Sequence, residues 1–241
     1  MTIDRRVVAL TGISIDDWRR LRRAYPALPP AAGARAAARR VLLARLASRR
    51  LSTGRWTVRI DGDPPAAEPT VYVSAHLGSL QALRYALRAR GVKAATVLGP
   101  HNLERPRAEA QDRVFDARHP LDFPHVFPAA AVHRLRGALR KGSLVLAADL
   151  PRPGEGVAAP FLGGRVLVDP RPFRLARAAG VPCRAAFLTL PRGRLTLTLG
   201  AELPGREKDA IEAFARCLAA TAARSPLDLD GVVYLRLAGE E

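Results

Sequence analysis

The sequence predicts an α/β protein, in which a mixed, mostly parallel sheet is flanked by helices and preceded by a helical cap. From Trp56 onward, short apolar runs that suit buried strands alternate with helical segments, which is typical of a sheet covered on both faces. The chain has 241 residues, 48% of them hydrophobic and 25% charged, enough for one large domain. We expect a single domain, 1–241, with a basic helical cap over residues 1–55 and an α/β core over residues 56–241.

The cap is expected to hold two helices. Ser14 ahead of Asp16 and Asp17 is typical of a capped helix start, Pro26 ends that helix, and a second helix is expected over about residues 35–50. The cap carries +10 of the formal net charge of +17. Two interpretations stay open: the pair lies on an anionic membrane, or its arginines simply extend into water.

The core shows strand and helix patterns in alternation. Residues 99–128 lack such a pattern, and a connection of that length is usually functional. Residues 150–165 are rich in proline and glycine and are expected to form a loop. Strands are expected at 56–62, 70–75, 92–98, 143–148, 181–190 and 194–200, and helices at 77–90, 129–141, 171–179 and 207–223. The run V-V-Y-L-R-L at residues 232–237 closes the chain.

The strongest chemical signal is the segment S-A-H-L-G-S-L-Q at residues 74–81. It places His76 directly beyond a buried strand, at the edge where open α/β sheets collect ligands. Gly78 permits close backbone approach, and Gln81, one turn into the next helix, can reach back toward the imidazole. A histidine held in one tautomer beside a helix N-terminus is the outline of a general base for acyl transfer. The alternative is a histidine that only makes a structural hydrogen bond.

These residues resemble the lysophospholipid acyltransferase-type superfamily. H-L-G-S-L-Q is similar to the H-x-G-N-W-E form of its H-x4-(D/E) motif, with the closest likeness to the bacterial lipid A late acyltransferase branch, which includes mannoside acyltransferases. R-K-G-S-L-V-L-A-A-D-L (140–150), P-F-L-G-G (160–164) and R-L-A-R-A-A-G-V-P (174–182) resemble further segments of that branch. The resemblance covers about residues 70–190.

The resemblance implies transfer of an acyl group from an acyl carrier protein or coenzyme A thioester to a hydroxyl, without a metal, a covalent intermediate or a further cofactor. His76 would be the general base, Gln81 would orient it, and Asp149 would lie in the site. The turn at residues 163–165 fits either a donor phosphate or a plain turn. The remaining substrate-binding candidates are Arg113, Gly78, Ser79, Phe161, Gly163 and Arg165.

The chain departs from the family pattern in three respects. Gln81 is neutral where the family has a carboxylate, so it can accept a hydrogen bond but cannot balance an imidazolium. Three interpretations follow: the acceptor is an amine, Asp149 substitutes for the missing acid, or the protein only binds its ligands. Ser79 and Leu80 replace Asn and Trp, and no apolar run approaches the roughly 20 residues of a membrane span. The acceptor stays open among a small metabolite, a carrier-bound intermediate and a glycolipid.

Other functions have weaker support. A nucleic-acid-binding protein, suggested by charge alone, should show an aromatic platform or a known motif, but aromatics make up 5% of the chain. Cys183 and Cys217 are expected to be buried small hydrophobes. No zinc site is expected, because metal-ligand spacing is missing among His101, His119, His125 and His133.

The expected partners follow from charge and resemblance together. A basic cap beside an acyltransferase-like core suits an acidic acyl carrier protein, or an anionic membrane surface contacted through residues 1–55, and not a nucleic acid. Two cysteines make no disulfide framework and favour a reducing compartment. We therefore expect a cytoplasmic protein, which lies at the inner membrane face if the cap contacts a membrane.

Overall fold

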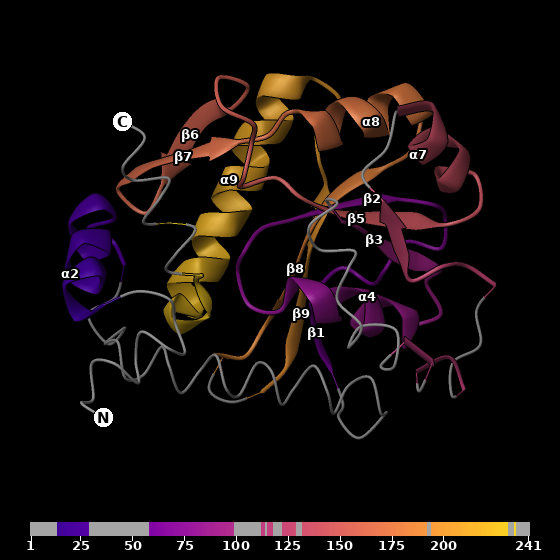
Figure 1. Cartoon of the computed structure of the whole chain (residues 1–241), viewed down its shortest axis with the longest axis horizontal. Coiled ribbons are helices and arrows are strands. Elements are labelled where there is room, and N and C mark those ends of the chain that lie inside the picture. The colour runs from indigo at the N-terminus through magenta and orange to yellow at the C-terminus, as the bar shows by residue number, and fades with distance from the viewer. Residues whose placement is uncertain are drawn as a thin grey trace.

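The computed structural model describes residues 14–28, 58–98, 112–113, 115–117, 122–128, 132–191, 194–230 and 234, apart from the side chains of Ile15, Gln81 and Leu227. It confirms the predicted α/β class with a seven-stranded sheet of order β1-β9-β8-β2-β5-β3-β4 (Figure 1). The strands are β1 (Arg59–Gly62), β2 (Val71–Ser74), β3 (Ala94–Leu98), β4 (Val126–Pro128), β5 (Ser143–Ala147), β8 (Cys183–Thr189) and β9 (Thr196–Glu202).

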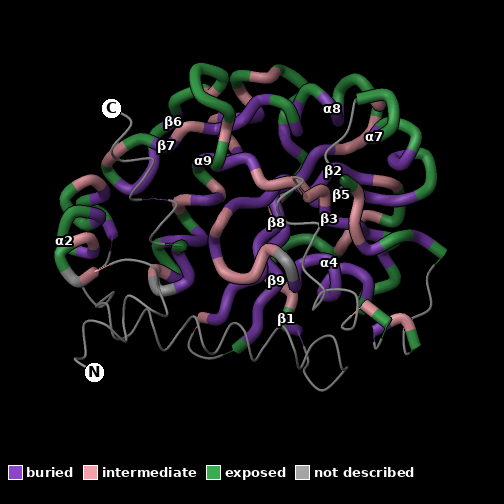
Figure 2. The backbone as a smooth tube through the Cα atoms, in the orientation of Figure 1, coloured by how far each residue is buried: buried purple, intermediate pink, exposed green. Residues whose placement is uncertain are grey.

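The sheet is mixed and mostly parallel, as expected. Its neighbouring strands run parallel except for the antiparallel pair of β8 and β9. Every residue of β2 and β8 is buried, which explains why the sequence shows continuous apolar runs there. Figure 2 shows these central strands in the buried colour and the outer faces of the helices exposed.

Helices cover both faces of the sheet. Helix α4 (Leu80–Arg88) packs on one face, where its apolar side joins a buried cluster with Tyr72 of β2. Three helices lie on the opposite face (Figure 1): α7 (Val132–Leu139), α8 (Arg171–Ala179) and α9 (Glu207–Arg224). The described parts of the core therefore match the predicted alternation of strands and helices.

The described part of the cap is helix α2 (Ile15–Ala24), and its start is the predicted one. The Ser14 hydroxyl accepts a hydrogen bond from the Asp17 backbone N–H, and the Asp17 carboxylate accepts one from the Ser14 backbone N–H. Trp18 and Leu21 are buried in the core, so α2 is anchored to the domain. The second expected cap helix lies outside the described residues. Both interpretations of the basic cap stay predictions.

The prediction of a loop over residues 150–165 was wrong in its second half. Strands β6 (Val157–Phe161) and β7 (Gly164–Val168) form an antiparallel hairpin that contacts α9. Its two-residue turn has positive φ at both Leu162 (49°) and Gly163 (83°), the geometry that suits the twist of a hairpin. Alternate burial along each strand is the missed signal, which proline and glycine obscured. Strand β4 was also missed within residues 99–128.

The C-terminal segment is described in part. Of the run V-V-Y-L-R-L at residues 232–237, the structure describes only Tyr234. The Tyr234 backbone N–H donates to the carbonyl of Asp230, four residues earlier, which is a helical hydrogen bond and not a strand pairing. Just before it, Leu229 makes an antiparallel bridge to Leu77. This brings the C-terminal segment beside the residues that follow β2.

Gly78 lies where two backbones meet closely. Its φ is 73°, and a Cβ built there would stand 2.0 Å from the carbonyl oxygen of Leu188. The Gly78 N–H donates to the Asp228 carbonyl, and the Ser79 N–H donates to that of Leu188. The close approach expected of Gly78 is therefore an approach to strand β8 of the protein itself.

We expect Gly78→Ala to lower the free energy of unfolding by about 3 kcal/mol or more, because left-handed backbone strain adds to an overlap with main-chain atoms. Urea denaturation measures the change. Gly137→Ala is the control: Gly137 lies within α7 with no atom within 4 Å of its added Cβ, and alanine there should stabilise the protein by about 0.5–1 kcal/mol. Equal shifts in the two variants would contradict the backbone-contact argument.

Candidate functional site

The site is formed where two neighbouring parallel strands end. Strands β2 and β5 pair with Ser74 opposite Ala147, so the residues two positions beyond, His76 and Asp149, come together at the carboxyl edge of the sheet. The Nδ1 atom of His76 lies 2.8 Å from Oδ1 of Asp149, and the His76 backbone N–H donates to Oδ2 at 2.7 Å. His76 thus makes a hydrogen bond to each of the two carboxylate oxygens of Asp149.

Burial differs sharply between the two partners. The Asp149 side chain is fully buried, whereas 28% of the His76 side chain is exposed. In the neutral ring, Nδ1–H donates to the carboxylate, so Nε2 carries the lone pair and is the basic atom. The pair can therefore accept a proton at Nε2, with the resulting imidazolium held beside a buried negative charge.

The charges around His76 favour its protonated form. Burial lowers the pKa of His76, but the hydrogen bond and charge of Asp149, together with the charge of Asp230, outweigh burial and raise that pKa above 6.5. Asp230 also donates its backbone N–H to the His76 carbonyl at 3.0 Å. Asp230 was not predicted from the sequence, because it comes from a distant part of the chain.

The raised pKa makes a testable prediction of pH dependence. Because a general base must be neutral, activity should fall as the pH drops through the pKa of His76, with a midpoint above 6.5. The same shift stabilises the fold, fully below about pH 6.5, and that contribution is lost as the pH rises through the folded-state pKa. Rate–pH profiles and thermal melts measure the two effects, and an activity midpoint below 6.5 would contradict the assignment.

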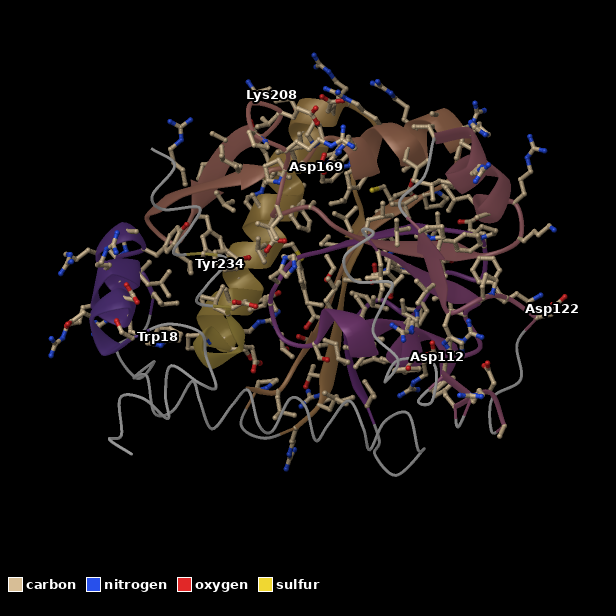
Figure 3. The ribbon with its side chains drawn as sticks, in the orientation of Figure 1. Trp18, Asp112, Asp122, Asp169, Lys208 and Tyr234 are labelled. Atoms are coloured by element: carbon tan, nitrogen blue, oxygen red, sulfur yellow. The ribbon has the colours of Figure 1, made fainter. Side chains whose placement is uncertain are left out.

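A tyrosine from the C-terminal segment lies against the pair. Tyr234 is fully buried, and burial together with the charge of Asp149 raises the pKa of its hydroxyl well above 10. Among the described residues its oxygen has no hydrogen bond of standard geometry. Its ring stacks on Phe161 at 5.3 Å and meets Tyr25 of the cap edge-on. Figure 3 shows it on the α2 side of the molecule.

This aromatic cluster gives one sequence-predicted residue a definite position. Phe161 was a substrate-binding candidate, and the structure places it one ring away from Asp149, through Tyr234. Tyr234 was not identified from the sequence. The only available signal was a lone aromatic near the end of the chain, and nothing local connected it to β2 or β5.

The turn of the β6–β7 hairpin contacts the cap. Gly163 and Arg165 are exposed, and the turn packs on the end of α2, where the Ala27 N–H donates to the Leu162 carbonyl. A Cβ on Gly163 would lie 3.4 Å from Pro26. The turn therefore contacts the cap, and the substrate-binding roles of Gly163 and Arg165 stay predictions.

The structure describes the predicted residues at the start of α4 to different extents. Gln81 lies in the first turn of α4, but its side chain is outside what the structure describes, so its orienting role stays a prediction. Asp149 occupies Nδ1 of His76, the ring nitrogen that an orienting group would take. Ser79 directly precedes the helix and its side chain does not cap it. The substrate-binding roles of Ser79 and Gly78 are likewise untested.

The described part of the 99–128 segment contacts the outer side of helix α4. Arg84 contacts Asp112 at 2.8 Å, and His125 Nε2 lies 2.7 Å from Asp116. Burial lowers the pKa of His125 despite these acids, which favours its neutral form. Arg113, beside Asp112 (labelled in Figure 3), is exposed. Residues 99–111 lie outside the described parts.

No group of three or more potential metal ligands occurs among the described residues. Cys183 and Cys217 form no disulfide, and burial raises the pKa of the Cys183 thiol to about 12, as suits a small hydrophobe. No helix within the described ranges is both long and apolar enough to cross a membrane.

Comparisons with known proteins give limited information. No family model matches the chain, and no curated protein does. Among solved structures, the fold is similar to that of the 1-acyl-sn-glycerophosphate (LPA) acyltransferase PlsC from Thermotoga maritima. The identity is 13% and the TM-score 0.45, over 77% of this chain and 80% of that one. At this level of likeness, the chemistry of the site depends on its own geometry.

Proposed function

We propose that this protein transfers an acyl group from a thioester donor, an acyl carrier protein or coenzyme A, to a hydroxyl or amine of an acceptor. The observation that carries the proposal is the pair of His76 and Asp149, joined at 2.8 Å at the carboxyl edge of the parallel strands. The resemblance of residues 74–81 to an acyltransferase motif supports the same chemistry.

The proposed mechanism needs one base and one leaving thiol. Nε2 of His76 takes the proton from the acceptor while the oxygen or nitrogen of the acceptor attacks the thioester carbonyl. The tetrahedral oxyanion then collapses, the carbon–sulfur bond breaks, and the imidazolium returns its proton to the departing thiolate. Asp149 holds the ring and stabilises the imidazolium, as the carboxylate does in the Ser-His-Asp arrangement.

Helix α4 adds a source of positive potential. It begins at Leu80, four residues after the base, and we propose that its N-terminus faces the reacting carbonyl. Free N–H groups and the positive end of a helix dipole favour an oxyanion. The short link between His76 and the helix is what makes this arrangement possible.

The neutral Gln81 is compatible with this mechanism. Of the three interpretations of that departure, the contact between Asp149 and Nδ1 supports the second, in which Asp149 supplies the missing carboxylate. With an acid already bound to the ring, position 81 need not carry a charge. The donor and acceptor stay broad: either thioester, and a small metabolite, carrier-bound intermediate or glycolipid.

The proposed docking partner follows from α2. The exposed side of α2 carries basic residues, and its buried side packs into the core beside the hairpin. A partner that binds the basic side would therefore be held at the surface of the domain. We propose an acidic acyl carrier protein or an anionic membrane surface as that partner. The basic side chains are those of Arg19, Arg20, Arg22 and Arg23.

The test is a transfer assay with purified protein. Acyl carrier protein and coenzyme A thioesters are offered with hydroxyl and amine acceptors, while thiol release and acylated product are measured by absorbance and mass spectrometry. We expect release that requires both an acceptor and His76. Transfer unaffected by His76→Ala would refute the mechanism. Thioester binding without thiol release would indicate a protein that only binds its ligands.

A further inference from the structure

A cavity of about 760 Å³ lies away from His76, under the C-terminal end of α9. Its floor is the α9-facing side of three neighbouring strands. Thr196 of β9 pairs with Arg59 of β1 and with Thr189 of β8, and all three line the cavity. The cavity therefore sits where β1, β8 and β9 meet the helix end.

The floor of the cavity is unusually polar for a sheet face covered by a helix. On the α4 side of β9, Leu197 and Leu199 are buried in an apolar cluster. On the α9 side the same strand places Thr196 and Thr198, each 6% exposed, toward the cavity. Thr221 of α9 lines it as well. Thr196 and Thr221 donate their hydroxyls to the carbonyls of Arg194 and Cys217, so Thr198 is the floor threonine that we expect to donate to a ligand.

The rim of the cavity is positively charged. Arg59, Arg194 and Arg224 line it together with one acid, Asp61. Asp61 is bound to Arg224 at 2.6 Å. Within the described parts of the chain, Arg59 and Arg194 make no ion pair. Two guanidinium groups are thus left to bind an anion, and the planar guanidinium is well matched to phosphate.

The cavity lies at the same edge of the sheet as the catalytic pair. β8 runs parallel to β2 and reaches Thr189 beside Gly78, which bridges Leu188. Two strand spacings separate β2 from β9, which is about 10 Å. Ser225 lines the cavity, and five residues later the Asp230 N–H holds the His76 carbonyl. The short segment 225–230 thus connects the cavity to the catalytic pair.

We propose that this cavity binds the phosphate group of a phosphorylated substrate, held by Arg59 and Arg194 with the hydroxyl of Thr198 as a further partner. Its assignment to a substrate rests on the proposed acyl transfer, and the binding itself does not. Two sources carry this chemistry: the phosphopantetheine arm of the thioester donor, and a phosphate ester on the acceptor. Because the cavity is separate from His76, we expect a ligand in which the reacting group and the phosphate are some distance apart.

The experiment measures binding by isothermal titration calorimetry, without turnover. The probes are 4′-phosphopantetheine against pantetheine for the donor, glycerol 3-phosphate against glycerol for the acceptor, and inorganic phosphate alone. The test variant is Arg59→Gln/Arg194→Gln. The charge-matched control is Arg136→Gln/Arg140→Gln, which removes two exposed arginines at the end of α7. Thr198→Val removes one floor hydroxyl at nearly constant volume, and thermal melts check folding.

We expect at least one phosphorylated probe to bind more tightly than its unphosphorylated counterpart. The double arginine variant should weaken that binding by about 100-fold, since two charge-assisted contacts are lost, while the control and His76→Ala bind like wild type. The pair of probes that shows the difference identifies the source. The proposal is overturned if phosphorylated and unphosphorylated probes behave alike, or if the control weakens binding as much. Loss of transfer chemistry alone would overturn only the proposed function.

Discussion

Replacing His76 with alanine should reduce kcat for acyl transfer by about 10²–10⁴, the usual contribution of a positioned general base. The reason is specific to Nε2: Asp149 engages Nδ1, so no other nitrogen of the ring can take the acceptor proton. The measurement is steady-state thiol release at saturating donor and acceptor. Little change in KM is expected, because the base acts on the chemical step.

Two further variants separate catalysis from folding. His76→Gln keeps a side-chain N–H that can reach the Asp149 carboxylate but supplies no base, so it should be as inactive as alanine with a smaller loss of stability. His133→Ala removes an exposed histidine of α7 and should leave both properties unchanged. Activity retained in His76→Gln would refute the role of the imidazole.

Replacing Asp149 with asparagine should have an effect of similar size. In the Ser-His-Asp template the equivalent change costs about 10⁴ in kcat, because the ring adopts the wrong tautomer and the imidazolium loses its partner. Asp149 is fully buried and accepts two hydrogen bonds from His76, so asparagine fits the space but alters both. We expect a large fall in kcat with a largely preserved fold.

The pH profile distinguishes this role from a structural one. Because Asp149 raises the pKa of His76 against the effect of burial, Asp149→Asn should shift the acidic limb of the residual activity to lower pH. Glu207→Gln is the control, since it removes a carboxylate that holds Arg174 at the surface by two hydrogen bonds. An unshifted limb in Asp149→Asn, or a loss of activity in the control, would contradict the assignment.

Several features of the fold followed from local signals. The Ser14 capping pattern and the buried strands at residues 70–75 and 143–148 depend on near neighbours and on apolar periodicity, and the structure confirms them. The position of His76 just beyond a strand followed in the same way. The hairpin of β6 and β7 was missed because its alternating burial is interrupted by proline and glycine, residues that also mark loops.

The site itself could be predicted only in part. Asp149 was a candidate because it follows a strand. Its contact with His76 depends on β5 lying next to β2, and the sequence of neither strand specifies that order. Asp230 and Tyr234 reach the site through backbone contacts that span more than 150 residues of sequence. No local pattern encodes a contact of that kind.

The sequence alone therefore determined the α/β class, the capped start of α2 and the histidine at a strand end, because each depends on residues close together in the chain. The tertiary structure decided which acid meets that histidine, which C-terminal groups surround the pair, and that polar sides of β1, β8 and β9 face one cavity. The physical reason is that strand neighbours are chosen by packing across the whole core, and the chemistry is assembled where those strands end.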